Sequence, residues 1–138
     1  MAKSTSYSGT PLAKKLGIKS GFNVWLINEP DYYLSLFDDM PDGVTFHKDL
    51  DTPEDLIHFF TSRKETLLAL LPQLKGRIKP NGSIWVSWPK KASKVITDVT
   101  EDMIRNYALQ IGLVDVKVCA IDEIWSGLKL VIPVKNRQ

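Results

Sequence analysis

The residues with the clearest chemical potential are hydroxyl and basic side chains that follow two buried runs. Ser62 and Arg63 begin a predicted helix directly after the apolar run 55–61, and the free N–H groups of a helix start attract anions. A second group follows the run 83–88 and consists of Lys90, Lys91, Ser93 and Lys94. Adjacent parallel strands lie about 4.8 Å apart, so their exit loops are neighbours. The spacing favours one rim that binds a phosphate or carboxylate. In the alternative reading Ser62 is only a helix cap and the lysines are solvated.

Other side chains are expected at the same rim. Glu29 follows the first predicted strand and Thr61 ends the third, while the turn between the last two strands supplies Asp122, Glu123 and Trp125. A carboxylate pair formed by Glu29 with Asp122 or Glu123 would allow general acid–base chemistry. These five residues are rim hypotheses, and the sequence assigns no catalytic residue.

The remaining reactive residue types favour a structural role. His47 and His58 lie on separate predicted strands without metal-ligand spacing, so we expect no metal site. His58 sits inside an apolar run and is expected to be a hydrogen-bonded core histidine. Cys119 lies in mid-strand between Val118 and Ala120, which is typical of an inert core thiol. No histidine is placed to activate a serine nucleophile.

The elements that must position these residues alternate along the chain. Apolar runs bounded by Pro and Gly predict six strands, over 22–27, 44–47, 55–61, 83–88, 114–121 and 128–134. Apolar stripes at helical spacing predict helices over 10–17, 31–40, 62–78 and 97–111. Pro72 predicts a kink in the third helix, which should resume and continue to Ile78.

Alternating strands and helices predict a parallel sheet covered on both faces. The last two strands are joined too tightly for a crossover, so they must be antiparallel. We expect a flexible segment over residues 1–9 and a single α/β domain over residues 10–138.

Composition bounds the classes of function. The 138 residues are 43% hydrophobic and 25% charged, with a formal net charge of +2, which is typical of a soluble globular domain. Residues 29–55 carry nine acidic residues and one lysine, whereas residues 63–94 carry eight basic residues and one glutamate. These blocks indicate either solvated faces or a bipolar surface that steers an anion. With so small a net charge, a nucleic-acid partner is not expected. The sequence shows no membrane span or signal peptide, and with one cysteine it predicts a cytoplasmic protein.

Two segments give the chain an architectural resemblance to class I S-adenosylmethionine methyltransferases. Asp55–Trp88 resembles the central strand–helix–strand of that fold, and Leu113–Pro133 resembles its terminal hairpin. The resemblance implies a three-layer, Rossmann-like α/β sheet of six strands in the order 2-1-3-4-6-5, with strand six antiparallel.

The cofactor motif of those methyltransferases does not carry over. They place a glycine-rich turn after the first strand, where this chain has Asn28-Glu29-Pro30-Asp31-Tyr32 and no glycine between Gly21 and Gly43. We expect Glu29-Pro30-Asp31 to fill the space of a cofactor's sugar, and Asp49 is a weak match to a ribose-binding acid. The sequence therefore predicts no bound cofactor.

Three motifs resemble a small bacterial family known only as a domain of unknown function. They lie at 6–18, 86–94 and 116–131, with Ser6-Tyr7-Ser8-Gly9-Thr10-Pro11 opening the first. The resemblance supplies no activity. The leading interpretation is a module that binds an anionic small molecule or partner at the strand-end rim, with little or no catalysis. The alternative is a small transferase related to class I methyltransferases.

Overall fold

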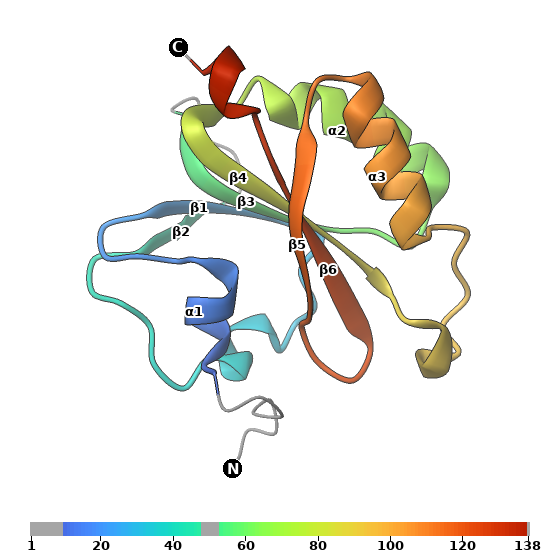
Figure 1. The fold of residues 1–138 in the computed structure, drawn as a ribbon. Helices are drawn as coiled ribbons and strands as arrows, with labels where there is room; N and C mark the ends of the chain where they lie inside the picture. Colours follow the sequence, from blue (N-terminus) through green and yellow to red (C-terminus); the bar gives the residue numbers. More distant parts are fainter. Residues whose placement is uncertain (1–9, 48–52, 138) are drawn as a thin grey trace.

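The computed structural model describes residues 10–47 and 53–137, which form a six-stranded sheet with helices on both faces (Figure 1). The predicted flexible segment 1–9 and Asp49 lie outside the described residues. The strands are β1 (Asn23–Ile27), β2 (Thr45–His47), β3 (Glu54–Phe60), β4 (Ile78–Pro89), β5 (Val114–Ala120) and β6 (Trp125–Val131). The α-helices are α1 (Leu12–Leu16), α2 (Lys64–Lys75) and α3 (Glu101–Gln110). Single 3-10 turns are η2 (Tyr33–Leu36), η3 (Lys91–Ser93) and η4 (Val134–Asn136).

The sheet confirms the predicted topology. Its strand order is β2-β1-β3-β4-β6-β5, with β1, β2, β3 and β4 mutually parallel. Strand β6 runs antiparallel to both β4 and β5. The tight connection between β5 and β6 forces this reversal, because a parallel pair needs a long crossover.

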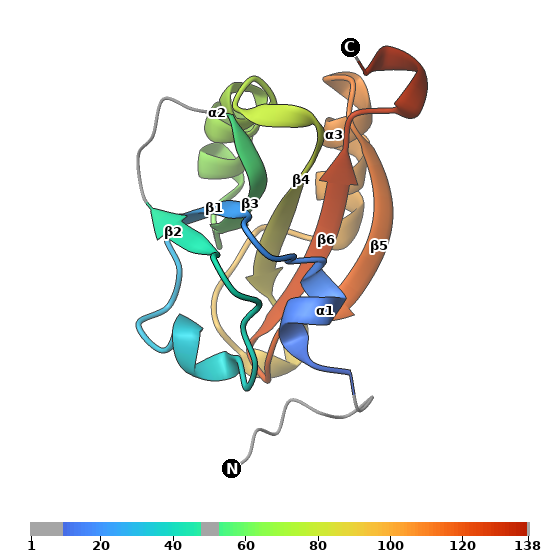
Figure 2. The ribbon, with the colours of Figure 1, turned by 90° about the vertical axis from the view of Figure 1, so that its left-hand side faces the viewer.

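Two apolar layers hold the helices against the sheet (Figure 2). Helices α2 and α3 cover one face, where Ile84 and Val86 of β4 point, and α1 with η2 covers the other face, where Trp85 points. Side chains alternate along a strand, so one apolar run supplies both cores. The Trp85 indole N–H donates to the carbonyl of Leu16 at 2.9 Å and ties α1 to the sheet.

Several predicted elements have other bounds in the structure, including the helix expected over 97–111, which begins at Glu101. The helix expected over 31–40 is only the turn η2, because Phe37 is already extended and Pro41 follows closely. The helix expected to reach Ile78 ends at Lys75, and Ile78 instead begins β4. The last strand begins at Trp125 and ends at Val131, because Pro133 has no N–H to donate to a ladder.

Residues Pro80-Asn81-Gly82, which precede the strand predicted over 83–88, lie inside β4. Glu54 pairs with Ile78 and Leu56 pairs with Ser83, so the residues between Ile78 and Ser83 form an irregularity in the ladder. A Cβ at Gly82 would lie 2.9 Å from the Glu54 carbonyl oxygen, so glycine is required for this close approach.

Pro72 lies inside a helix that the structure assigns without interruption from Lys64 to Lys75. Proline lacks an N–H, so the Leu68 carbonyl loses its usual partner in the helix. The Tyr107 hydroxyl from α3 donates to that carbonyl at 2.9 Å. The contact replaces the missing bond and joins α2 to α3.

Candidate functional site

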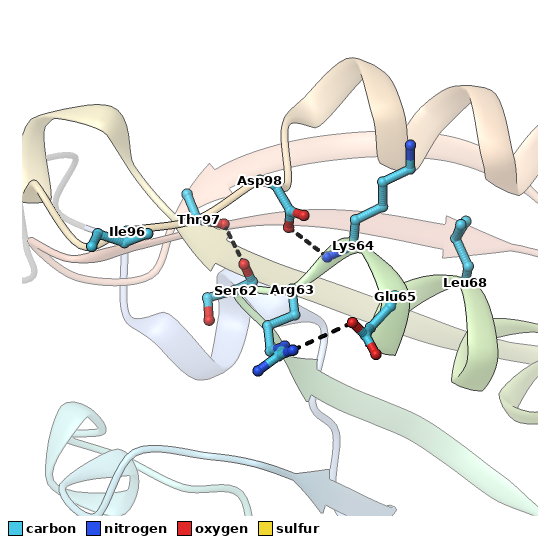
Figure 3. A pocket seen from close by; sticks show the side chains of 8 residues that line it. All are labelled: Ser62, Arg63, Lys64, Glu65, Leu68, Ile96, Thr97 and Asp98. Atoms are coloured by element: carbon cyan, nitrogen blue, oxygen red, sulfur yellow. Dashed lines mark hydrogen bonds and ion pairs between the residues drawn. The ribbon is translucent and has the colours of Figure 1, made fainter.

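A cavity of about 670 Å³ lies at the carboxyl edge of the sheet, beside the start of α2 (Figure 3). It is bordered by the turn that follows β3 and by the loop that leads from β4 to α3. The lining residues are Ser62, Arg63, Lys64, Glu65, Leu68, Ile96, Thr97 and Asp98. Ligands of open α/β sheets bind at this edge, so the cavity is the candidate site.

Hydrogen bonds across the cavity fix the loop to the start of α2. Asp98 Oδ1 accepts from the Lys64 backbone N–H at 2.6 Å, and Thr97 Oγ1 donates to the Ser62 carbonyl at 2.8 Å. The Asp98 N–H donates to the same Ser62 carbonyl at 3.3 Å. The Asp98 carboxylate therefore already accepts the hydrogen bond of the Lys64 N–H, which a bound anion would otherwise use at this helix start.

The prediction that Ser62 caps α2 is wrong by one residue. Arg63 holds the N-cap position and makes no side-chain cap hydrogen bond. Thr61, which is buried, supplies local order instead: its Oγ1 accepts from the Arg63 N–H at 3.1 Å. Asp98 then provides the side-chain cap from a distant part of the sequence.

The Arg63 side chain is engaged within its own helix. Its Nη2 lies 3.3 Å from Glu65 Oε1, and both side chains are largely exposed. Figure 3 shows the guanidinium on the side of the turn away from Asp98. An exposed ion pair of this kind contributes little to stability.

The lysine-rich group is ordered but stands apart from the cavity lining. Ser93 Oγ donates to the Lys90 carbonyl at 2.7 Å and accepts from the Val95 N–H at 3.2 Å. Lys94 ends η3 in the left-handed conformation, with φ of 63°. The described residues that line the cavity do not include Lys90, Lys91, Ser93 or Lys94. Their convergence with Ser62 and Arg63 on one anion stays a prediction.

The segment after β1 reaches across the carboxyl edge to the β5–β6 turn. The Tyr32 hydroxyl donates to Asp122 Oδ2 at 2.8 Å. Asp122 Oδ1 accepts from the N–H groups of Ile124 and Trp125, so its carboxylate orders the turn. Burial, followed by this hydrogen bond to Asp122, raises the pKa of Tyr32 to about 12.

The remaining rim candidates divide between packing and solvent. The Trp125 ring meets Phe60 edge-on, with centroids 5.0 Å apart. Glu123 is exposed in the turn. Glu29 lies close enough for its charge to raise the pKa of buried Tyr33, after the larger effect of burial. The proposed acid–base pair of Glu29 with Asp122 or Glu123 stays a prediction.

His58 is a hydrogen-bonded core histidine, as predicted. It is fully buried, with Nδ1 2.9 Å from the Tyr33 hydroxyl and Nε2 2.7 Å from Ser87 Oγ. Burial lowers its pKa to about 3, so the ring is neutral at physiological pH. Its two partners come from η2 and β4, and no local sequence signal identified them.

Glu54 and His47 form a second buried pair with a titratable group, and their pairing was not predicted from the sequence. Glu54 is fully buried at the start of β3, and its Oε1 lies 3.2 Å from His47 Nε2 at the end of β2. Burial raises the pKa of Glu54 to about 7 and lowers that of His47. The one sequence signal for this pair is the position of Glu54 directly before an apolar run, where a buried carboxylate is unusual.

Within the described ranges, no group of three or more His, Cys, Asp or Glu side chains is placed to hold a metal ion. No helix there is long and apolar enough to cross a membrane.

The turn after β1 differs from the expectation raised by its missing glycines. Asn28 follows the strand with φ of 59°, the left-handed conformation that glycine adopts most easily. Asparagine tolerates this conformation better than most residues. The backbone there is glycine-like, and whether Glu29-Pro30-Asp31 fills a sugar-sized space stays a prediction.

No family model and no curated protein matches the chain, so the resemblance to a domain of unknown function stays a prediction. Solved structures are similar in fold. A ribosomal protein L11 methylase from Lactobacillus delbrueckii subsp. bulgaricus has a TM-score of 0.57 and 15% identity, over 88% of this chain and 74% of that one. A SAM-dependent methyltransferase from Aquifex aeolicus has a TM-score of 0.56 and 13% identity, over 88% of both chains. A precorrin-6y C5,15-methyltransferase from Geobacter metallireducens GS-15 has a TM-score of 0.58 and 10% identity, over 88% of this chain and 85% of that one. With its strand order and reversed β6, the chain therefore has the Rossmann-like α/β fold of the S-adenosylmethionine-dependent methyltransferases.

Proposed function

We propose that this protein is a small transferase that binds S-adenosylmethionine at the carboxyl edge of β1 and β3. The observation that carries the proposal is the strand order, which reverses between β1 and β3 in a chain whose fold is similar to that of solved methyltransferases. Such a reversal opens a crevice outside the strand ends, and ligands of open α/β sheets bind there.

One feature of the turn after β1 supports such a ligand. The left-handed backbone of Asn28 makes the sharp turn that allows close approach of a ligand to the main chain. Asn28 and, after β3, Ser62 would hold the ligand through backbone N–H groups and side-chain oxygens. Asp49 is the residue that we would assign to the ribose, and it lies outside the described residues.

The cavity beside α2 would hold the methyl acceptor. Bound S-adenosylmethionine supplies an electrophilic methyl group. The chain's own contribution is alignment, because holding two reactants in register lowers the barrier without acid–base chemistry. Leu68 and Ile96 offer apolar walls, and Asp98 keeps one carboxylate oxygen for an amino or hydroxyl group of the acceptor. His58 is buried and takes no part.

Calorimetric titration tests this proposal with three probes: S-adenosylmethionine, S-adenosylhomocysteine and inorganic phosphate. Binding of the two adenosyl ligands at micromolar strength supports it. Asn28→Gly should bind as well as the parent, because glycine keeps φ positive, whereas Asn28→Val should bind at least tenfold more weakly. Circular dichroism checks that both variants fold.

The same titration decides on the leading interpretation of the sequence. Binding of phosphate without binding of the adenosyl ligands would contradict the transferase and support an anion-binding rim. In that case Lys91→Ala with Lys94→Ala should weaken phosphate binding by more than tenfold, since charge-assisted contacts are strong. Stability should change little, because exposed lysines contribute little to folding.

A further inference from the structure

The loop from Lys91 to Asp98 is held firmly while it exposes apolar side chains. Its backbone and hydroxyl groups are tied down through Ser93, Thr97 and Asp98, with five hydrogen bonds of 2.6 to 3.3 Å. Thr97 Oγ1 also accepts from the Val99 N–H at 3.0 Å, so the end of the loop is fixed as well. These hydrogen bonds therefore hold the backbone of the loop in place on both sides of Val95 and Ile96.

Two neighbouring aliphatic residues on this loop lie in solvent. Ile96 is 93% exposed and Val95 is 44% exposed. Ile96 also lines the cavity, on the loop segment directly before Thr97 (Figure 3). Exposed aliphatic side chains gain nothing from folding, and binding on a backbone that is already ordered loses less entropy.

Lysines flank these aliphatic residues along the loop, whereas the acidic residues Glu65 and Asp98 border the cavity itself. Lys91 and Lys94 are exposed in the same loop, and residues 90–97 contain no acidic residue. The nearest acid in the sequence, Asp98, is hydrogen-bonded to the Lys64 N–H. We name the surface formed by Lys91, Lys94, Val95 and Ile96 the KVI surface.

We propose that the KVI surface docks a protein partner through a segment that carries carboxylates and an aliphatic side chain. The carboxylates would pair with Lys91 and Lys94, and the aliphatic side chain would cover Ile96 at the edge of the cavity. A protein segment is favoured over single-stranded nucleic acid, because base stacking needs aromatic side chains and residues 90–98 contain none. The inference goes beyond the proposed function and does not rest on it, because docking needs no adenosyl ligand.

The test uses three labelled probes of equal charge and the protein without other ligands. They are a twelve-residue peptide of alternating Asp and Leu, the same peptide with Ser in place of Leu, and a single-stranded oligonucleotide of matching charge. Fluorescence anisotropy gives the affinities, and amide chemical shifts of the ¹⁵N-labelled protein locate the contact. The Asp–Leu peptide should bind at least tenfold more tightly than either other probe, with shifts confined to residues 62–65 and 90–98.

Matched variants distinguish specific docking at the KVI surface from nonspecific binding of the peptide. Ile96→Ser should weaken binding of the Asp–Leu peptide about tenfold or more, because one buried aliphatic side chain is lost. Lys91→Glu with Lys94→Glu should weaken it further. Val134→Ser and Lys135→Glu, which change an exposed valine and lysine of η4, should leave it unchanged. Equal binding of the Ser peptide or of the oligonucleotide, absence of binding, or an unaffected Ile96→Ser variant would overturn the proposal. None of these results depends on the titration with S-adenosylmethionine.

Discussion

Removal of the Tyr107 hydroxyl should expose how α2 tolerates its internal proline. The hydroxyl donates to the Leu68 carbonyl, which Pro72 leaves without its helical partner. In Tyr107→Phe that carbonyl lies under a phenyl ring with no donor. An unsatisfied, partly buried polar group costs about 1–3 kcal/mol. We expect the lower half of that range, because the contact is only partly buried.

The assay is urea unfolding followed by far-ultraviolet circular dichroism, for four proteins in a double-mutant cycle. The second substitution is Pro72→Ala, which restores an N–H to serve Leu68 within the helix. In that background Tyr107→Phe should cost less than about 0.5 kcal/mol, the usual limit for independent surface changes. The difference between the two costs is the coupling between the proline and the tyrosine.

If Tyr107→Phe costs the same in the parent and in the Pro72→Ala background, the hydroxyl does not replace the missing N–H. If it costs nothing in either protein, water serves Leu68 equally well. Thermal unfolding offers an independent reading, since about 1 kcal/mol corresponds to roughly 3–4 °C for a chain of this size.

Three further predictions concern buried or capping polar groups. Ser87→Ala should cost about 1–3 kcal/mol by urea unfolding, because it leaves His58 Nε2 buried without a partner; a change below about 0.5 kcal/mol would show that the contact is dispensable. Asp98→Ala should cost about 0.5–2 kcal/mol, because it removes the side-chain cap of α2 at Lys64; urea unfolding at two salt concentrations checks this, and an unchanged midpoint would refute it. Glu54 has a pKa raised to about 7, so the folded state binds its proton more tightly than the unfolded state, and its contribution to stability falls as pH rises from about 4.5 through 7. The lowered pKa of His47 contributes the opposite slope, so the comparison is between Glu54→Gln and the parent: the variant should gain relative stability between about pH 5 and 8, and a constant difference would contradict the assignment.

The strands of the sheet could be predicted from the sequence because their signals are local, whereas their order was implied by the architectural resemblance. The apolar runs that became β1, β3 and β4 are each bounded by proline or a polar turn, and the short link between β5 and β6 permits only an antiparallel pair. The end of α2 could not be placed, because Ile78 fits the apolar stripe of a helix as well as the start of a strand. Periodicity alone cannot separate the two for a single residue.

The candidate site could be predicted only in part, because the contacts that order it join residues far apart in the sequence. Asp98 caps α2 from 34 residues away, and Tyr32 reaches Asp122 across 90 residues. Ser62 matched the usual cap preference, yet Arg63 took the cap position because Thr61 orders the turn through its hydroxyl. The left-handed backbone of Asn28 was not predicted either, because the absence of glycine says which residue types are present and does not fix the backbone angles.

The central claim is that the carboxyl edge of this methyltransferase-like sheet binds an adenosyl ligand. Amide chemical shifts of the ¹⁵N-labelled protein, recorded during titration with S-adenosylhomocysteine, test it most directly. The account predicts saturable shifts centred on Asn28 and Glu29 after β1 and on Thr61 and Ser62 after β3. An unchanged spectrum at millimolar ligand, or shifts that spare both turns, would contradict it.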